Sequence, residues 1–133
     1  MNFLLDTDTI SAHVRRPAGL QARFVQYPGR LYVSSISLAE LYALAYRLDD
    51  PARRLDEIDG IVRNEVGLID FDAGCARAFG QLGAGLIRRG SGVPPIDLLI
   101  GSVAVAHDMT LVTHNTADFL PIPGLRLVDW LSS

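Results

Sequence analysis

The chain begins Met1-Asn2-Phe3-Leu4-Leu5-Asp6-Thr7-Asp8-Thr9-Ile10, and within this stretch a short apolar run ends at an aspartate. Such a run, bounded by polar residues, is typical of a strand that is buried on both faces of a parallel sheet. Asp6 would then stand at the carboxyl end of the strand, where open parallel sheets bind their ligands. Its alternative role is to cap a helix that begins after Thr7. For Asp8 we expect a capping role, with support of a metal site as the alternative.

Short apolar runs and helical patterns alternate along the rest of the chain. Further strands are predicted at 31–36, 66–71, 110–113 and 125–128. Apolar residues spaced three and four apart predict helices at 37–48, 52–64, 73–89 and 95–107, the last beginning at Pro95 because proline is favoured in a first turn. Strands that are separated by helices form a mainly parallel sheet with helices on both faces. The sequence therefore predicts an α/β fold.

Length and composition limit the class of protein. The chain has 133 residues, the usual size of one domain, and we treat residues 1–133 as a single unit. Hydrophobic residues make up 49% and charged residues 20%, which is a globular composition. No apolar run reaches the roughly 20 residues of a membrane span, and the first residues lack the basic region of a signal peptide. We therefore expect a cytoplasmic protein.

Charge and cysteine usage exclude some functions. The net charge of -3 argues against a protein that holds nucleic acid by bulk electrostatics, although a local basic face could still do so. All 12 positive side chains are arginines, and the sequence has no lysine. Cys75 is the sole cysteine, which rules out an internal disulfide and a cysteine-rich zinc site. A core position is expected for it.

Three further acidic residues lie where strands end or helices begin. Glu40 closes the sequence Ser37-Leu38-Ala39-Glu40, which has the form of a capping box, so a cap and a ligand are about equally supported. Asp97 lies in the first turn of the Pro95 helix, where the helix dipole favours a carboxylate whatever its function. Asp118 follows the strand predicted at 110–113, and a turn or cap is its alternative role.

Together with Asp6, these residues form a set of four carboxylates that a parallel sheet would gather in one crevice. Carboxylates that lie close together repel one another unless a cation lies between them. Ligands that are all oxygen favour Mg²⁺ or Mn²⁺ over zinc. The histidines, His13, His107 and His114, have no metal-type spacing and are expected at the surface or in caps.

The residues around the four acids resemble a known family. The matching segments are Leu4-Leu5-Asp6-Thr7-Asp8-Thr9-Ile10-Ser11, Ser37-Leu38-Ala39-Glu40-Leu41, Pro94-Pro95-Ile96-Asp97-Leu98-Leu99-Ile100-Gly101-Ser102-Val103-Ala104, Leu111-Val112-Thr113-His114-Asn115-Thr116-Ala117-Asp118-Phe119 and Gly124-Leu125-Arg126-Leu127-Val128-Asp129-Trp130. In this order they are similar to the PIN-domain ribonucleases, specifically the VapC toxins of bacterial toxin–antitoxin pairs. Each motif is weak alone, but the four that carry the acids, in this arrangement, are fairly specific.

The resemblance implies a three-layer α/β/α fold and a Mg²⁺-dependent endoribonuclease that is restrained by a cognate antitoxin and is often a homodimer. It also implies that Asp6 and Asp97 are the principal metal ligands, that Glu40 and Asp118 complete the acidic pocket, and that Thr113 and Asn115 give polar support. Asp8 departs from the family pattern, in which asparagine is more usual. No motif specifies the RNA, and a transfer RNA is one candidate. Candidate RNA contacts are Arg15, Arg16, Arg88, Arg89 and His114.

Other interpretations of the same residues remain. A haloacid-dehalogenase-like phosphatase would use Asp6 and Asp8, since its motif has two aspartates one residue apart after a strand. That chemistry normally uses a lysine to steady the phosphoryl group, as does the acidic pocket of a receiver domain, and this chain has no lysine. A catalytically silent binding module on the same scaffold is the third alternative, which the loss of a key acid would favour; all four acids are present.

Overall fold

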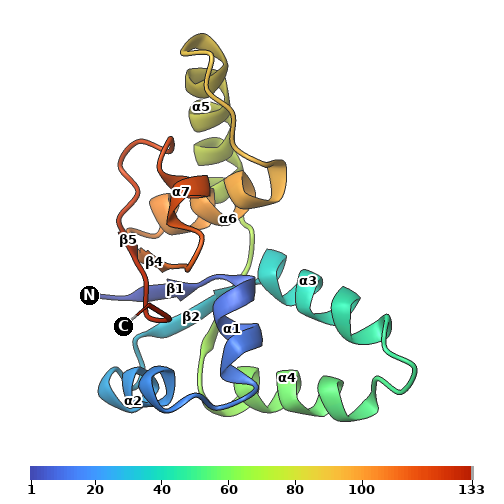
Figure 1. The fold of residues 1–133 in the computed structure, drawn as a ribbon. Coiled ribbons are helices and arrows are strands. Elements are labelled where there is room, and N and C mark those ends of the chain that lie inside the picture. Colours follow the sequence, from blue (N-terminus) through green and yellow to red (C-terminus); the bar gives the residue numbers. More distant parts are fainter. Residues whose placement is uncertain (133) are drawn as a thin grey trace.

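A computed structural model describes residues 1–132, in which five strands and seven helices form one sheet and its covering layers (Figure 1). The strands are β1 (Phe3–Leu5), β2 (Leu31–Ser34), β3 (Gly67–Ile69), β4 (Thr110–Val112) and β5 (Leu127–Val128). The helices are α1 (Thr7–His13), α2 (Ala18–Gln26), α3 (Ser35–Tyr46), α4 (Ala52–Asn64), α5 (Ala73–Arg88), α6 (Pro95–Ala106) and α7 (Thr116–Phe119). The strands are parallel in the order β3-β2-β1-β4-β5, so β1 is central.

The apolar run at the start of the chain builds the centre of this sheet. Successive side chains of a strand point to opposite faces. Phe3 and Leu5 therefore face one layer of helices and Leu4 faces the other, and Leu4 and Leu5 are both 0% exposed. Because helices cover both faces, β1 is continuously apolar and shows no polar alternation.

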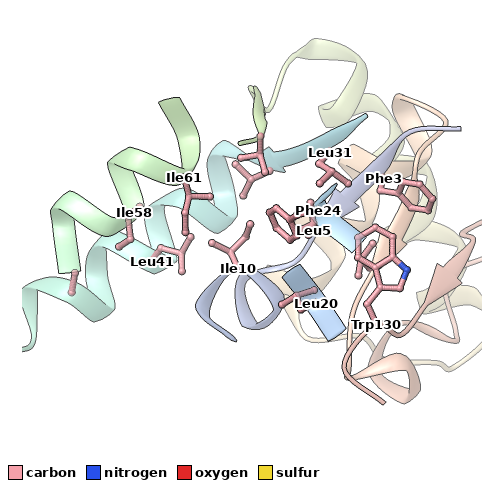
Figure 2. Close-up of a cluster of buried hydrophobic side chains, with 14 residues drawn as sticks. Phe3, Leu5, Ile10, Leu20, Phe24, Leu31, Leu41, Ile58, Ile61 and Trp130 are labelled. Carbon is pink, nitrogen blue, oxygen red and sulfur yellow. The ribbon is translucent and has the colours of Figure 1, made fainter. Parts of the chain in front are cut away.

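Two hydrophobic cores lie on the two faces of the sheet. Helices α1 to α4 form the core beside Phe3 and Leu5, and Figure 2 shows Phe24 of α2 among its members. Trp130 closes this core near the C-terminus, with its ring centroid 4.9 Å from that of Phe3. Helices α5 to α7 form the core beside Leu4. The two layers of helices and the sheet make the three-layer α/β/α sandwich that the resemblance implies.

Helix α5 and its link to α6 form an arm that extends away from the sheet in Figure 1. The chain turns back after Arg88, so α5 packs along α6 and the start of α5 lies beside the end of α6. Ile87, near the tip, is 81% exposed. Within residues 1–132, no helix is both long and apolar enough to cross a membrane.

Most predicted elements are confirmed, and the errors have local causes. The helix predicted at 37–48 begins at Ser35, because the hydroxyl of Ser34 accepts a hydrogen bond from the N–H of Ser37 at 3.0 Å and caps it there. The strands predicted at 66–71 and 125–128 are shorter, as β3 and β5. Helices α2 and α7 were not predicted, since α2 buries just Leu20 and Phe24 and α7 spans four residues.

Candidate functional site

The candidate site lies where the strand order reverses. β2 lies on one side of β1 and β4 on the other, and such a switch point is where open parallel sheets bind ligands. The N–H of Asp6 donates to the carbonyl oxygen of Val112 at 3.0 Å, so the carboxyl ends of β1 and β4 lie side by side. Residues that follow these two strands are thereby brought to one edge of the sheet.

A pocket of about 150 Å³ opens at this edge. It collects acidic side chains from α3, α6 and the segment after β1, and within residues 1–132 no basic side chain lines it. The lining residues are Asp6, Thr7, Asp8, Glu40, Leu44, Asp97, Ile100, Asn115 and Phe119. The fold therefore brings Asp6, Glu40 and Asp97 together, as predicted, and adds Asp8 to them.

Asp6 caps helix α1 and also faces the pocket. Its Oδ1 accepts a hydrogen bond from the N–H of Thr9 at 2.8 Å, which makes Asp6 the N-cap of α1. The residue is 4% exposed, and this burial raises the pKa of its carboxyl above the ordinary value, although hydrogen bonds from Thr113 and Thr9 partly offset the rise. A buried carboxylate with few compensating charges favours a bound cation.

Asp97 experiences the combined charge of the pocket. It is half-buried in the first turn of α6, and its pKa is raised first by burial and then by Asp118 and Glu40. Asp6 and Asp8 raise it further. A divalent cation with oxygen ligands would remove this repulsion, so the donor set of the pocket fits Mg²⁺ or Mn²⁺.

Glu40 lies in the second turn of α3 and is not part of a capping box. The expected cap at Ser37 is wrong, because Ser34 occupies the N-cap and the Ser37 hydroxyl has no hydrogen-bond partner within residues 1–132. Glu40 Oε1 instead accepts a hydrogen bond from the hydroxyl of Thr7 at 2.5 Å. Thr7 is thus a pocket residue that the sequence did not identify, since 33 residues separate it from Glu40.

Asp8 lines the pocket from the first turn of α1. The expected capping role is wrong, because Asp6 is the cap. Asp8 Oδ2 accepts a hydrogen bond from Asn115 Nδ2 at 2.7 Å, and the N–H of Asn115 donates to the hydroxyl of Thr113 at 3.0 Å. The two predicted supporting residues therefore connect Asp8 to the end of β4.

The remaining predicted residues lie outside the pocket. Asp118 is exposed on α7 and does not line it, although its charge reaches Asp97. Arg15 lines a separate cleft of about 480 Å³. Among the other candidate RNA contacts, Arg16 donates two hydrogen bonds of 2.6 and 2.9 Å to Glu65. Arg88 is exposed at the end of α5, and Arg89 donates to the Pro121 carbonyl at 3.3 Å. His114 Nδ1 lies 3.0 Å from Asp129 Oδ2.

The PIN domain family model matches residues 3–123. The tRNA(fMet)-specific endonuclease VapC of Shigella flexneri is 35% identical over 131 residues, 98% of each chain. Ribonuclease VapC of Haemophilus influenzae is 30% identical over 132 residues, 98% of this chain and 99% of that protein. The toxin chain in the crystal structure of DNA-bound VapBC from Salmonella typhimurium matches with a TM-score of 0.93 and 34% identity over 98% of each chain.

A family match of this extent makes the chain a PIN-domain protein, a class of metal-dependent nucleases. The full-length relatives narrow the assignment. The chain belongs to the VapC family of PIN-domain ribonucleases. This confirms the resemblance drawn from the motifs and removes the phosphatase and receiver-domain alternatives.

Proposed function

We propose that the chain is the toxin of a type II toxin–antitoxin pair and uses Mg²⁺ to hydrolyse phosphodiester bonds within RNA. The observation that carries the proposal is the pocket in which Asp6, Glu40 and Asp97 converge, with no basic side chain among its lining residues within 1–132. Mn²⁺ is expected to substitute, because it accepts the same oxygen ligands.

We assign separate roles to the acids of the pocket. Asp6 and Asp97 would hold the metal ion, whose charge would offset the burial and repulsion that raise their pKa values. Bound Mg²⁺ supplies activation of a water molecule and stabilisation of the charge that develops on the phosphate. Glu40 would orient or deprotonate the attacking water through Oε2, since Thr7 holds Oε1. Asp118 completes the set at longer range, through its charge on Asp97.

The RNA is held by groups outside the pocket. Arg15, Arg88, Arg89 and His114 are exposed and are the candidates for phosphate contacts. Arg16 is the weaker candidate, because Glu65 occupies its guanidinium. One relative, 35% identical, is named as specific for tRNA(fMet), so tRNA(fMet) is the first substrate to test.

An antitoxin is the proposed protein partner. The similar structures from Salmonella typhimurium and Rickettsia felis are VapBC complexes bound to DNA, with TM-scores of 0.93 and 0.90. A VapB-type chain that covers this toxin would restrain the nuclease. A homodimer of the toxin is the expected assembly in its absence.

Cleavage of RNA by the isolated chain tests the nuclease. Antitoxin-free protein is incubated with total RNA and with tRNA(fMet) in Mg²⁺, Mn²⁺ or a chelator, and the new ends are sequenced. Asp97→Asn removes one proposed ligand. Asp108→Asn makes the same chemical change at a residue whose side chain is 88% exposed and which does not line the pocket.

The expected result is a discrete set of cuts that needs a divalent ion, disappears in Asp97→Asn and persists in Asp108→Asn. Cuts that survive both Asp97→Asn and the chelator would contradict the assigned metal site. Absence of any cut by folded, metal-loaded protein would favour the non-catalytic binding module. Cuts in other RNAs but not in tRNA(fMet) would correct the substrate alone.

A further inference from the structure

A second group of metal-type side chains lies apart from the acidic pocket. Asp72, Cys75 and His107 each present one ligand atom, and these atoms lie within 4.8 Å of one another. We propose that this group binds one Zn²⁺ ion, which ties the start of α5 to the end of α6. The group is distinct from the nuclease pocket, because Asp97 and His107 lie ten residues apart along α6, about 15 Å at the rise of an α-helix.

Local structure holds the first ligand in place. Asp72 is the N-cap of α5, and its Oδ1 accepts a hydrogen bond from the N–H of Cys75 at 2.9 Å. This bond orients the carboxylate and leaves Oδ2 facing His107, 3.3 Å from Nε2. His107 is the C-cap of α6, so the antiparallel packing of the two helices brings the ligands together.

The Nε2 atom of His107 is the observation that points to a ligand. It is buried and has no hydrogen-bond partner within residues 1–132, although Asp72 Oδ2 lies 3.3 Å away. A buried polar atom without a partner costs stability. Zn–N and Zn–O bonds of about 2.0 Å in a tetrahedral site place the two ligand atoms about 3.3 Å apart. The spacing of the two atoms therefore matches that of two zinc ligands.

Cys75 supplies the ligand that discriminates between metals. It is 0% exposed, and its Sγ donates a weak hydrogen bond to the Asp70 carbonyl oxygen at 4.0 Å. A thiolate and an imidazole favour Zn²⁺, whereas Mg²⁺ prefers oxygen ligands alone. Three protein ligands with water in the fourth position complete a tetrahedral site. Asp72 and His107 are 51% and 31% exposed in their side chains, which gives the ion a path from solvent.

Zinc uptake by this group releases one proton. A free cysteine thiol is mostly protonated at neutral pH, and a metal ligand must be the thiolate. When the Zn–S bond forms, the S–H bond breaks and the proton passes to solvent. Zinc affinity should therefore rise with pH.

Metal binding in excess Mg²⁺ tests the site without any nuclease assay. The metal-free full chain is titrated with Co²⁺ and, by equilibrium dialysis, with Zn²⁺, while Mg²⁺ saturates the acidic pocket. Cys75→Ser and His107→Gln each remove one ligand, and His114→Gln is the matched control because that histidine is exposed and contacts Asp129. Asp97→Asn separates the two sites. Circular dichroism verifies that each variant is folded.

We expect one Zn²⁺ per chain and a thiolate-to-cobalt charge-transfer absorption, both retained in His114→Gln and Asp97→Asn. Cys75→Ser should abolish the absorption, and His107→Gln should weaken zinc binding at least about tenfold, because even residues that merely support a metal ligand cost that much. If Cys75→Ser fails to fold, His107→Gln decides alone. No zinc uptake in Mg²⁺, or uptake that is unchanged in His107→Gln, would overturn the proposal. Uptake lost in Asp97→Asn would place the ion in the acidic pocket and overturn it as well.

Discussion

The acidic pocket and the cluster of His13, Arg16 and Glu65 handle charge in opposite ways. In the pocket, carboxylates gather and repel one another, and the pKa of Asp97 is raised. In the cluster, Glu65 accepts two hydrogen bonds from Arg16 and lies 3.0 Å from His13 Nε2. Burial alone would raise the pKa of Glu65, but these partners lower it below its ordinary value. Both sets join distant segments of the chain, and they differ in whether the charges are compensated.

The difference separates residues that stabilise the fold from residues that await a ligand. A paired carboxylate stabilises the folded state, because folding provides its partner. Unpaired carboxylates of one sign cost stability, and they persist at sites whose chemistry needs them. The two regions should therefore respond in opposite directions when one carboxylate is neutralised.

Neutralising Asp6 should give the largest effect on activity. Asp6→Asn keeps a good N-cap for α1 but removes a proposed metal ligand. We expect RNA cleavage to fall by at least about a hundredfold, because residues that merely orient metal ligands already cost 10- to 100-fold. In metal-free buffer, the free energy of unfolding should stay equal or rise, since the charged form of Asp6 is disfavoured by burial. Cleavage rates and urea denaturation check the two halves.

Neutralising Glu65 should reverse this pattern. Glu65→Gln leaves Arg16 and the buried His13 without their carboxylate, so the free energy of unfolding should fall by about 1–2 kcal/mol, with cleavage unchanged. Glu57→Gln is the matched control, because Glu57 lies 3.8 Å from Arg53, whose side chain is 94% exposed. Its effect should be below about 0.5 kcal/mol. Equal effects of the two substitutions would show that the cluster is no more than a surface ion pair.

Removal of the Thr7 hydroxyl should have a smaller effect on activity. Thr7→Val keeps the shape of the side chain but deletes the donor to Glu40 Oε1. Glu40 then loses its fixed orientation, and we expect cleavage to fall by about tenfold or less, the equivalent of one hydrogen bond. Thr7→Ser, which keeps the hydroxyl, should restore most of the rate. A rate for Thr7→Val equal to that of the parent would show that Thr7 does not position Glu40.

Most of the fold could be predicted from local sequence patterns. The errors in the prediction arose where tertiary contacts determine the structure. The run Phe3–Leu5 and the start at Pro95 were visible as local patterns. The choice between Ser34 and Ser37 as cap of α3 was not, since both are serines followed by helix-forming sequence. His13 was expected at the surface or in a cap but is 0% exposed, stacked on Phe24 with ring centroids 3.5 Å apart. That burial depends on α2, which the sequence did not reveal.

The site could be predicted to the extent that its residues follow strands or begin helices. Asp6 and Asp97 are such residues, and the parallel sheet brings them together. The hydrogen bond between Thr7 and Glu40 depends on how α1 packs on α3, which no local pattern encodes. The same is true of Cys75 and His107, whose separation in sequence gives no metal-type spacing.

Acidification should change the contributions of the two regions to the free energy of unfolding in opposite directions. The change that comes from the cluster is the smallest effect that we expect. Burial lowers the pKa of His13 below its ordinary value of 6.5, Glu65 raises it in part, and Arg16 lowers it. The unfolded chain therefore takes up this proton at higher pH than the folded chain, so stability is lost as pH falls below 6.5. In the pocket, the raised pKa values of Asp6 and Asp97 favour proton uptake by the folded chain, which stabilises it at low pH.

The difference between the parent and His13→Gln isolates the effect of His13, because both proteins share the pocket. Between pH 7 and pH 6 the parent should lose up to about 0.7 kcal/mol more than the variant in urea denaturation. Identical slopes would mean that the folded protein binds the His13 proton as readily as the unfolded chain does.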